Sequence, residues 1–219
     1  MSDDIPVLSE IMKDEFKDIP IEKIFSRNVP GILEILKSKC VGIAGCGGLG
    51  SNVAVMLTRS GIGKLVVADF DTVALENLNR QHFFLDQIGK PKVEALVEML
   101  ERINPHLEYT PVQKQLSPKN IESIFGHVDV MVEAFDLASE KQMLIECWLK
   151  LENGKPIVAV SGVAGLGGID KIKVNRLNNL VVVGDFVTDL KAGLIAPKVM
   201  MVASAQAEIV IELLLEKRK

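Results

Sequence analysis

One short segment constrains the fold more than any other, the glycine loop Gly45-Cys46-Gly47-Gly48-Leu49-Gly50. The apolar run Val41-Gly42-Ile43-Ala44 leads directly into this loop, and a helical pattern begins at Leu49. Glycines at such a strand-to-helix turn allow the backbone to approach a phosphate closely, and the helix N-terminus favours its negative charge. Asp69 ends the next apolar run, where a carboxylate can accept hydrogen bonds from ribose hydroxyls. The segment therefore predicts a nucleotide site in a Rossmann-like α/β domain.

Short β-branched runs alternate with longer helical patterns from Lys39 onward, which is typical of βαβ units and a mostly parallel sheet. Two short runs that flank Asn178-Asn179 predict a hairpin, and therefore an antiparallel edge. We expect helices on both faces of this sheet. The predicted strands are 40–45, 64–69, 107–112, 128–133 and 156–161, the predicted hairpin is 169–177 with 180–183, and the predicted helices are 48–60, 89–103, 138–152 and 197–216.

Residues 1–38 differ in pattern from the rest of the chain. Apolar residues recur at helical spacing up to Phe16, and prolines then interrupt the pattern. We interpret this stretch as a helical N-terminal arm that packs on another surface, and residues 39–219 as the nucleotide-binding core. A length of 219 residues favours one domain, so we predict a single unit over 1–219.

Charge and cysteine content restrict the possible partners and the compartment. The 25 basic and 29 acidic residues give a net charge of −4 without a basic stripe, so we expect no nucleic-acid partner. Three cysteines, an odd number, fit a reducing compartment better than a disulfide framework. The acidic first residues do not resemble a signal peptide, and no apolar run approaches the ~18 residues of a membrane span. We therefore predict a cytoplasmic protein that does not bind membranes.

A polar block follows the second predicted strand, from Asp69 to Gln81, and Gly89-Lys90 comes soon after it. Arg80 and Lys90 can neutralise phosphate charge, the arginine as a planar fork and the lysine as a point charge. Asn77 can donate to the same oxygens. The alternative is that both cations are ordinary solvated surface residues. A dehydrogenase has no evident use for this block, whereas triphosphate chemistry does.

Asp136 follows the predicted strand 128–133, so it is expected at the carboxyl edge of the sheet, where ligands bind in open α/β folds. A carboxylate there can hold Mg²⁺, which prefers oxygen ligands and bridges to nucleotide phosphates. The alternative is that Asp136 caps the helix that starts near Leu137. The residues alone leave both interpretations open.

Together these segments resemble the ThiF/MoeB/HesA family of the ubiquitin-activating-enzyme-like superfamily, over about residues 25–216. The matching segments are the glycine loop, Asp69-x-Asp71, Asn77-Leu78-Asn79-Arg80-Gln81, Gly89-Lys90, Arg102-Ile103-Asn104-Pro105-His106, Asp136 and Gly193-Leu194-Ile195-Ala196-Pro197. The resemblance implies that the chain uses ATP to adenylate the C-terminal glycine carboxylate of a small ubiquitin-fold sulfur carrier protein ending in Gly-Gly. Pyrophosphate is the second product of that reaction.

The resemblance also implies a role for each matching residue. The nucleotide-binding set would be Gly45, Gly47, Gly48, Leu49, Gly50, Asp69, Asp71, Asn77, Arg80 and Lys90. Asp69 would bind the ribose, Asn77, Arg80 and Lys90 the phosphates, and Asp136 the magnesium ion. The family's homodimer would bring Arg27 into the partner's site, so that the catalytic set would be Arg27, Arg80, Lys90 and Asp136.

The chain also departs from this family in two ways. It has no Cys-x-x-Cys pair, so we expect no structural zinc and place it nearest the compact, zinc-less branch of ThiF, which acts on the thiamine-pathway carrier. Residues 184–190 contain no cysteine, which favours adenylation without a covalent enzyme intermediate. The alternatives are a molybdopterin-type carrier adenylyltransferase, a tRNA-modifying relative, an NAD(P)-dependent oxidoreductase, and an adaptor that binds a carrier without ATP chemistry.

Overall fold

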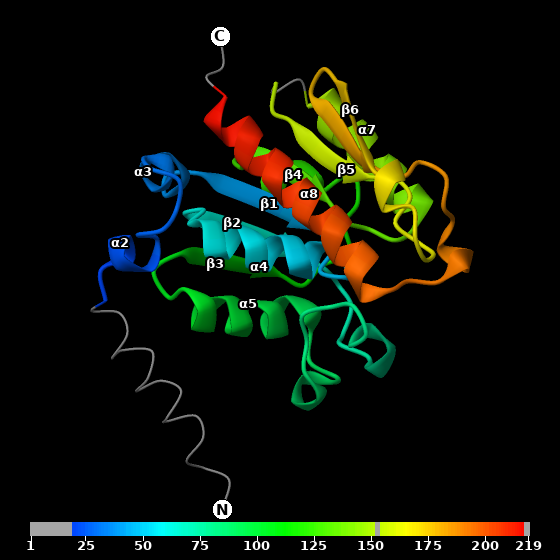
Figure 1. The fold of residues 1–219 in the computed structure, drawn as a ribbon, viewed down its shortest axis with the longest axis horizontal. Helices are drawn as coiled ribbons and strands as arrows, with labels where there is room; N and C mark the ends of the chain where they lie inside the picture. Colours follow the sequence, from blue (N-terminus) through cyan, green and yellow to red (C-terminus); the bar gives the residue numbers. More distant parts are fainter. Residues whose placement is uncertain (1–18, 152–153, 217–219) are drawn as a thin grey trace, which may run out of the picture.

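The computed structural model describes residues 19–151 and 154–216 and contains one seven-stranded sheet (Figure 1). The strands lie in the order β3-β2-β1-β4-β5-β7-β6, and every neighbouring pair is parallel except β6 and β7. Their bounds are β1 Cys40–Ala44, β2 Lys64–Ala68, β3 Glu108–Val112, β4 Val130–Glu133, β5 Ile157–Val160, β6 Lys173–Leu177 and β7 Leu180–Gly184. The predicted Rossmann-like sheet with an antiparallel edge is therefore confirmed.

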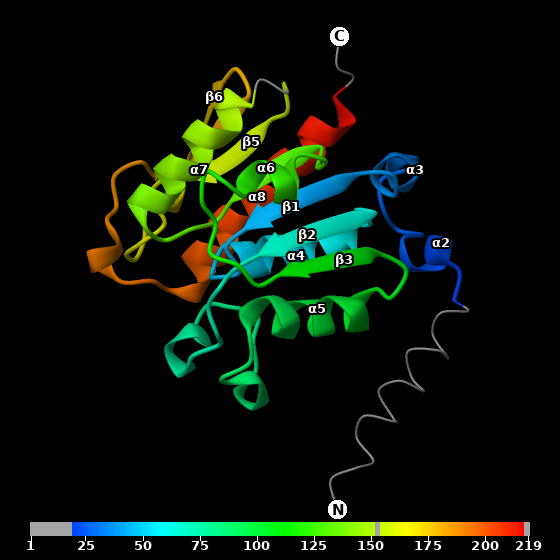
Figure 2. The same cartoon turned by 180° about the vertical axis from the view of Figure 1, so that it is seen from behind.

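Helices cover both faces of the sheet, as predicted. Figure 1 shows α4 (Gly50–Ser60), α5 (Lys92–Ile103) and α8 (Ala196–Leu215) over one face, and Figure 2 shows α6 (Ile121–Phe125) and α7 (Ala138–Lys150) over the other. The short helices are α2 Ile21–Ile24, α3 Ile32–Leu36, η1 Leu75–Asn77, η2 Leu85–Gln87, η3 Ile169–Lys171 and η4 Leu190–Ala192.

Both faces of the sheet are apolar because both are covered, which explains the nearly continuous apolar runs in the sequence. Successive strand residues point to opposite faces, so Val67 belongs to the cluster under α4, α5 and α8, and Val66 to the cluster under α6 and α7. Gly42 lies on the second face, where an added Cβ would come within 2.7 Å of the Phe125 ring. The glycine therefore makes room for the largest side chain of α6.

Two predicted boundaries differ from the structure, and one helix was missed, for local reasons. The predicted helix 89–103 begins only at Lys92, because Gly89 has a φ of +88° and Pro91 occupies the N-cap position. The first hairpin strand begins at Lys173, since residues 169–171 form η3 instead. Helix α6 was not predicted, because five residues are too few to show a helical period.

The strand order reverses between β1 and β4, and this reversal creates the space for a ligand. β1 continues into α4 on one face, whereas β4 continues into α7 on the other face. The two connections therefore diverge at the carboxyl edge of the sheet and leave a crevice between them.

The described part of the N-terminal segment packs at the opposite end of α4 from the glycine loop. Phe25 and Leu36 are buried, and the Phe25 ring lies against Gly61, the C-cap of α4. The Asn28 side chain donates to the Ser60 carbonyl over 3.1 Å. The amphipathic pattern up to Phe16 lies outside the described residues.

Candidate nucleotide-binding site

A pocket of about 820 Å³ opens at this carboxyl edge, which is within the size range of small-molecule sites. Its walls come from the glycine loop, the segments after β2 and β4, the start of α5, and the segments after β5 and β7. The predicted residues that line it are Gly45, Gly47, Gly48, Leu49, Asp69, Asp71, Asn77, Arg80 and Asp136. The structure therefore brings most of the predicted site residues together.

The glycines of the loop serve different purposes. Gly45 has a φ of +95°, and an added Cβ would lie 2.7 Å from the Ala134 carbonyl oxygen. Gly50 does not line the pocket; a Cβ there would lie 1.8 Å from the Gly45 oxygen, so it permits α4 to start against the loop. Gly47 has room for a side chain, since an added Cβ would make only an ordinary van der Waals contact, 3.7 Å from the Gln81 side-chain nitrogen. No side chain caps α4, and although the Ser51 N–H donates to the Gly47 carbonyl over 3.0 Å, the dipole of this helix N-terminus favours an anion.

Asp69 links the end of β2 to the glycine loop. Its side chain is buried at the pocket wall, and Oδ2 accepts a 2.6 Å hydrogen bond from the Cys46 N–H. Oδ1 accepts a second bond of 2.9 Å from the Asp71 N–H. A carboxylate has about four acceptor positions, so two remain for a pair of hydroxyl groups. This arrangement is suited to ribose.

The pocket contains Lys92, whereas Lys90, the predicted phosphate ligand, lies outside its lining. The Lys90 ammonium lies 3.2 Å from Glu98 Oε2, in a pair whose side chains are about half exposed. Lys92 Nζ lies 2.8 Å from Asp71 Oδ2, and the Lys92 side chain is only 8% exposed. A β-bridge pairs Thr72 with Pro91, the residue between the two lysines, and Lys90 and Lys92 on either side of Pro91 lie in different environments. No local signal in the sequence distinguished the two lysines, because both lie in the first turn of the predicted helix 89–103.

The polar block after β2 is connected to the glycine loop through a residue that sequence analysis missed. Asn52, fully buried in α4, donates to the Gly48 carbonyl over 2.6 Å and to the Arg80 carbonyl over 3.0 Å. The Arg80 guanidinium donates to the Glu76 carbonyl and lines the pocket. Asn77 uses its side-chain oxygen to accept from the Ala74 N–H, which leaves its NH₂ group as the donor for a ligand.

Asp136 lies in the connection from β4 to α7 and lines the pocket, as predicted. The N-cap of α7 is Leu137 and no side chain caps the helix, so the alternative capping role for Asp136 is not observed. Glu140, in the first turn of α7, lines the same wall. Partial burial, together with the charges of Asp136, Asp69 and Asp71, raises the pKa of Glu140 above its ordinary value. This wall of the pocket therefore favours a cation.

The donor chemistry of this wall fits Mg²⁺, which typically takes one or two protein carboxylates, several waters and substrate phosphates. Among the described residues, no three His, Cys, Asp or Glu side chains converge as a preformed metal cage. At such a site Asp136 would supply one ligand of the Mg²⁺ ion, and the nucleotide would supply the remaining ones.

An ion pair with a fully buried carboxylate and a partly buried lysine supports this wall from beneath. Glu133, at the end of β4, has no exposed surface, and both of its carboxylate oxygens lie 2.7 Å from Lys141 Nζ. Glu133 also accepts from the Phe135 N–H, and Gln206 of α8 donates to the Glu133 carbonyl. These bonds fix the connection that carries Asp136.

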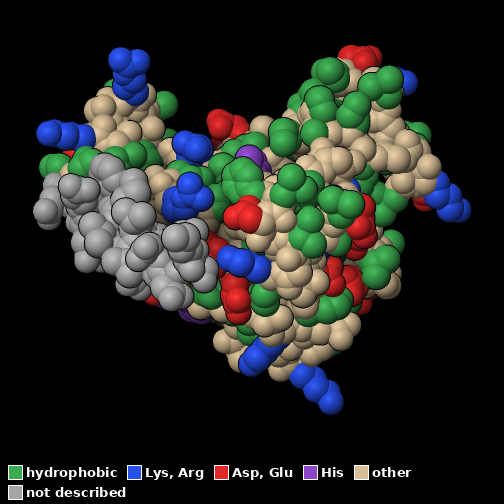
Figure 3. Space-filling model, turned by 90° about the horizontal axis from the view of Figure 1, so that it is seen from below, with side chains coloured by type: hydrophobic (Ala, Val, Ile, Leu, Met, Phe, Trp, Pro, Cys, Tyr) green, Lys and Arg blue, Asp and Glu red, His purple; other side chains and the backbone are tan. Residues whose placement is uncertain are grey.

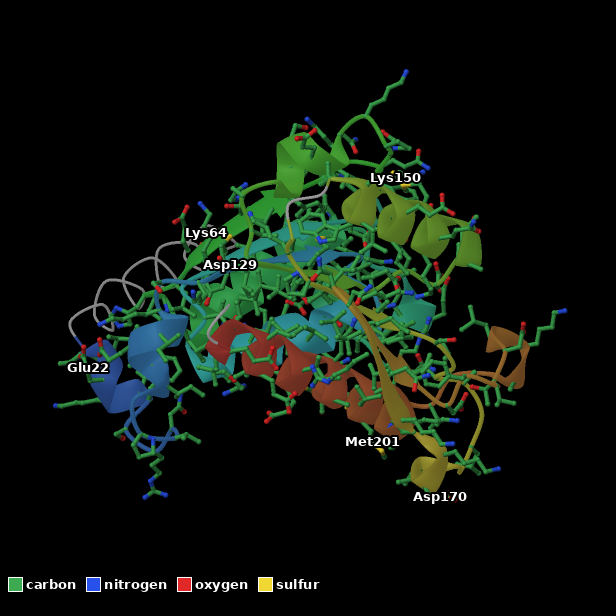
Figure 4. The ribbon with its side chains drawn as sticks, turned by 90° about the horizontal axis from the view of Figure 1, so that it is seen from above. Glu22, Lys64, Asp129, Lys150, Asp170 and Met201 are labelled. Atoms are coloured by element: carbon green, nitrogen blue, oxygen red, sulfur yellow. The ribbon has the colours of Figure 1, made fainter. Side chains whose placement is uncertain are left out.

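Arg27 is not brought to the pocket of its own chain. It lies between α2 and α3, near the carboxyl end of α4, whereas the glycine loop precedes the amino end of that helix. The 11 residues of α4 separate the two ends by about 16 Å. Figure 4 shows Glu22, in α2, at the opposite end of the molecule from Asp170, in η3.

The comparison with protein families agrees with this geometry: the ThiF family model matches residues 22–219. The chain belongs to the ThiF family. A curated relative is the molybdopterin-synthase adenylyltransferase of Escherichia coli, 32% identical over 186 residues that cover 83% of this chain and 75% of that protein. The tRNA threonylcarbamoyladenosine dehydratase of Bacillus subtilis is 34% identical over 64% of this chain and 57% of its own length.

Solved structures share the fold of this ThiF-family chain. The E. coli tRNA N6-threonylcarbamoyladenosine dehydratase TcdA, in complex with AMP, has a TM-score of 0.79 at 20% identity and matches 88% of this chain and 93% of that one. E. coli MccB with ATP has a TM-score of 0.67 at 23% identity and matches 84% of this chain and 57% of that one. Among the described helices, none has the length and apolarity that a membrane crossing would need.

Proposed function

We propose that this chain is an adenylyltransferase that uses ATP to activate the C-terminal glycine carboxylate of a small ubiquitin-fold sulfur carrier protein. One observation carries the proposal: a single pocket contains the glycine loop, the ribose-type carboxylate Asp69, the cations Arg80 and Lys92, and the carboxylate Asp136. An oxidoreductase would not need two cations and an acidic wall in the same pocket. An adaptor would have no reason to keep Lys92 buried with its charge paired.

In the proposed reaction, a carboxylate oxygen of the carrier attacks the α-phosphorus of ATP, and the bond from that phosphorus to the pyrophosphate oxygen breaks. The products are an acyl adenylate and pyrophosphate. Asp69 orients the ribose, and the N–H groups of the glycine loop hold the phosphates. Arg80 and Lys92 stabilise the negative charge that grows on the leaving pyrophosphate. Asp136 would hold Mg²⁺, which when bound neutralises phosphate charge.

The carrier is the finer part of the proposal. The resemblance to the compact branch of ThiF favours the thiamine-pathway carrier, and the similarity to the E. coli molybdopterin-synthase adenylyltransferase makes a molybdopterin-type carrier the first alternative. The similarity to the B. subtilis tRNA threonylcarbamoyladenosine dehydratase makes tRNA the second alternative. Over the face in Figure 3, Lys and Arg side chains lie among Asp and Glu side chains, which favours a protein over a polyanion.

ATP–pyrophosphate exchange tests this proposal. The purified chain is assayed with a thiamine-type carrier, a molybdopterin-type carrier and bulk tRNA, each with and without Mg²⁺. We expect exchange that requires Mg²⁺ and a carrier with a C-terminal Gly-Gly, and that Asp136→Ala abolishes. Exchange without any carrier, or exchange that Asp136→Ala does not reduce, would refute the mechanism.

The role of Arg27 is tested by mixing variants. We propose that the chain forms a homodimer in which Arg27 of one protomer completes the partner's pocket, because this residue is remote from its own pocket. Arg27→Ala and Asp136→Ala proteins should each be inactive, and their mixture should recover activity in heterodimers that keep one intact site. A mixture that stays inactive although heterodimers form would exclude a shared site.

A further inference from the structure

Two consecutive side chains at the start of α4, Ser51 and Asn52, connect the glycine loop to the segment after β2. Both residues are fully buried. The Ser51 hydroxyl donates to the Gly47 carbonyl over 2.7 Å and accepts from the His82 N–H over 3.2 Å. One hydroxyl group therefore bonds to both segments, as a donor to the loop and as an acceptor from the segment after β2. We call Ser51 and Asn52 the clamp.

Asn52 makes the same kind of connection one residue further along the helix. Its NH₂ group donates to the Gly48 carbonyl over 2.6 Å and to the Arg80 carbonyl over 3.0 Å. Because both partners are carbonyl oxygens, they determine which end of the amide faces them. The clamp thus holds the carbonyls of two successive loop glycines and the backbone on both sides of Gln81.

The clamp determines which way the glycine loop presents its N–H groups. In a planar trans peptide the C=O and the N–H of the next residue point in opposite directions. With the Gly47 and Gly48 carbonyls held toward α4, the N–H groups of Gly48 and Leu49 point away from this helix. Both residues line the pocket, and neither N–H donates to another described residue. These two groups can therefore donate to a phosphate.

The segment after β2 also packs directly on the same two glycines. An added Cβ at Gly48 would lie 3.4 Å from Cγ and 3.5 Å from Cδ of Arg80. One at Gly47 would lie 3.7 Å from Gln81 Nε2. The stem of Arg80 therefore lies against the loop, and Arg80 lines the pocket beside it. This contact and the clamp together set the spacing between the loop N–H groups and the Arg80 cation.

Asn52 is not a favourable residue for packing alone. Its Oδ1 atom is buried and has no hydrogen-bond partner among the described residues. An acceptor buried in this way costs free energy, because it gives up its bonds to water without replacement. The contribution of the Asn52 side chain therefore lies in its two donors, which meet at the junction of the loop with the segment that carries Arg80.

We infer that Ser51 and Asn52 are positioning residues for the triphosphate: they hold the loop N–H groups and Arg80 at one spacing, so that both bind the phosphates of the same nucleotide. The inference rests on the proposed function, since it takes ATP as the ligand. It goes beyond that proposal by giving two residues outside the nucleotide-binding set a role that concerns the phosphates and not the nucleoside. Asp69, the proposed ribose ligand, is held instead by the N–H groups of Cys46 and Asp71.

The test compares the binding of ATP with that of adenosine, which lacks the phosphates. Asn52→Ala removes both donors, and Ser51→Ala removes the hydroxyl. Asn52→Ser leaves a hydroxyl that can reach the carbonyl four residues back, as Ser51 does, but is too short to reach Arg80 as well. The matched control is Ser60→Ala, because the Ser60 hydroxyl makes the same bond, to the Met56 carbonyl over 2.8 Å, at the other end of α4. Each variant is checked by thermal unfolding and titrated with each ligand by calorimetry, with Mg²⁺ and without a carrier.

For Asn52→Ala we expect an ATP Kd raised about tenfold, and for Asn52→Ser and Ser51→Ala about threefold to tenfold, since each loses at least one bond between the two segments. The adenosine Kd should stay within about twofold in all three, because the nucleoside contacts are separate from the clamp. Ser60→Ala should change neither value.

Equal weakening of ATP and adenosine binding in the folded variants, or unchanged ATP binding, overturns the inference. If Asn52→Ala does not fold, Asn52→Ser and Ser51→Ala provide the same comparison. Because no carrier is present in the titrations, a wild type that binds ATP but shows no carrier-dependent exchange refutes the adenylation proposal and leaves the result on the clamp valid.

Discussion

Two lysines that are two positions apart in the sequence should behave very differently when each is replaced by methionine. Lys92 lies in the pocket with its side chain 8% exposed, and Lys90 lies outside it in an exposed pair with Glu98. Methionine keeps most of the length of the side chain and removes the charge. Lys92→Met should therefore lower kcat/KM for ATP strongly, while Lys90→Met should leave it nearly unchanged.

The size of the effect follows from the setting of Lys92. Two unit charges 4 Å apart interact by about 4 kcal/mol at an effective dielectric constant of 20. Asp71, 2.8 Å from Nζ, already offsets part of the lysine charge, so a loss of about 2 kcal/mol of transition-state stabilisation is expected. That corresponds to about a 30-fold fall in kcat/KM. For Lys90, whose ion pair is exposed, a change below about threefold is expected.

The assay is ATP–pyrophosphate exchange at varied ATP and saturating carrier, with thermal unfolding of both variants as a control for folding. Asp71 is 49% exposed, so water can solvate its carboxylate after Lys92 is replaced, and the fold should survive. The reasoning is refuted if Lys90→Met loses as much kcat/KM as Lys92→Met, or if folded Lys92→Met keeps wild-type kcat/KM.

Three further predictions concern the glycine loop, the ribose site and acid stability. Gly50→Ala should lower Tm by about 2–12 °C, because its Cβ would meet the Gly45 oxygen at 1.8 Å. Gly47→Ala should leave Tm nearly unchanged and weaken ATP binding, and equal Tm values for the two variants would contradict this difference. Asp69→Asn should weaken ATP binding by about tenfold in calorimetry. The reason is that the amide NH₂ would face one of the two N–H donors, at Cys46 or Asp71, from which the carboxylate now accepts. Undiminished binding would exclude a ribose role. Although burial acts to raise the pKa of Asp185, the Lys198 ammonium, 2.8 Å from Oδ2, and neighbouring N–H donors hold it below its ordinary value. Because the folded pKa of Asp185 lies below its unfolded value, its stabilising contribution is present above about pH 4 and is lost as the pH falls through the folded pKa. The Tm difference between wild type and Asp185→Asn should therefore stay constant from pH 7 to about pH 5 and shrink below about pH 4, and a difference that shrinks already at about pH 6 would contradict the assignment.

The parts of the fold that could be predicted are those in which burial imposes a period on the sequence. Strands such as β1 and β4 are covered on both faces, so they appear as short apolar runs between helical patterns. The glycine loop could be located because it follows such a run directly. Helix α6 could not be found, since its five residues are held by packing of Phe125 on Gly42 and not by a repeating pattern.

The site residues that escaped prediction depend on contacts between distant segments. Whether Lys90 or Lys92 enters the pocket depends on the pairing of Thr72 with Pro91, which no local pattern of residues indicates. The buried partners of Lys198 and Asn52 likewise come from other segments, Ala164 and Arg80 among them. Residue type and spacing along the chain can suggest a lysine for phosphate, but three-dimensional packing decides which lysine it is.

The pairing of Lys92 with Asp71 bears on the protein before any nucleotide arrives. A buried ammonium without a counter-ion would destabilise the fold, and Asp71 supplies that counter-ion from a position 49% exposed to water. If a phosphate oxygen of ATP took the place of the carboxylate beside Lys92, water could solvate the released Asp71 group. On the proposed function, ATP binding would therefore exchange one negative group for another beside Lys92.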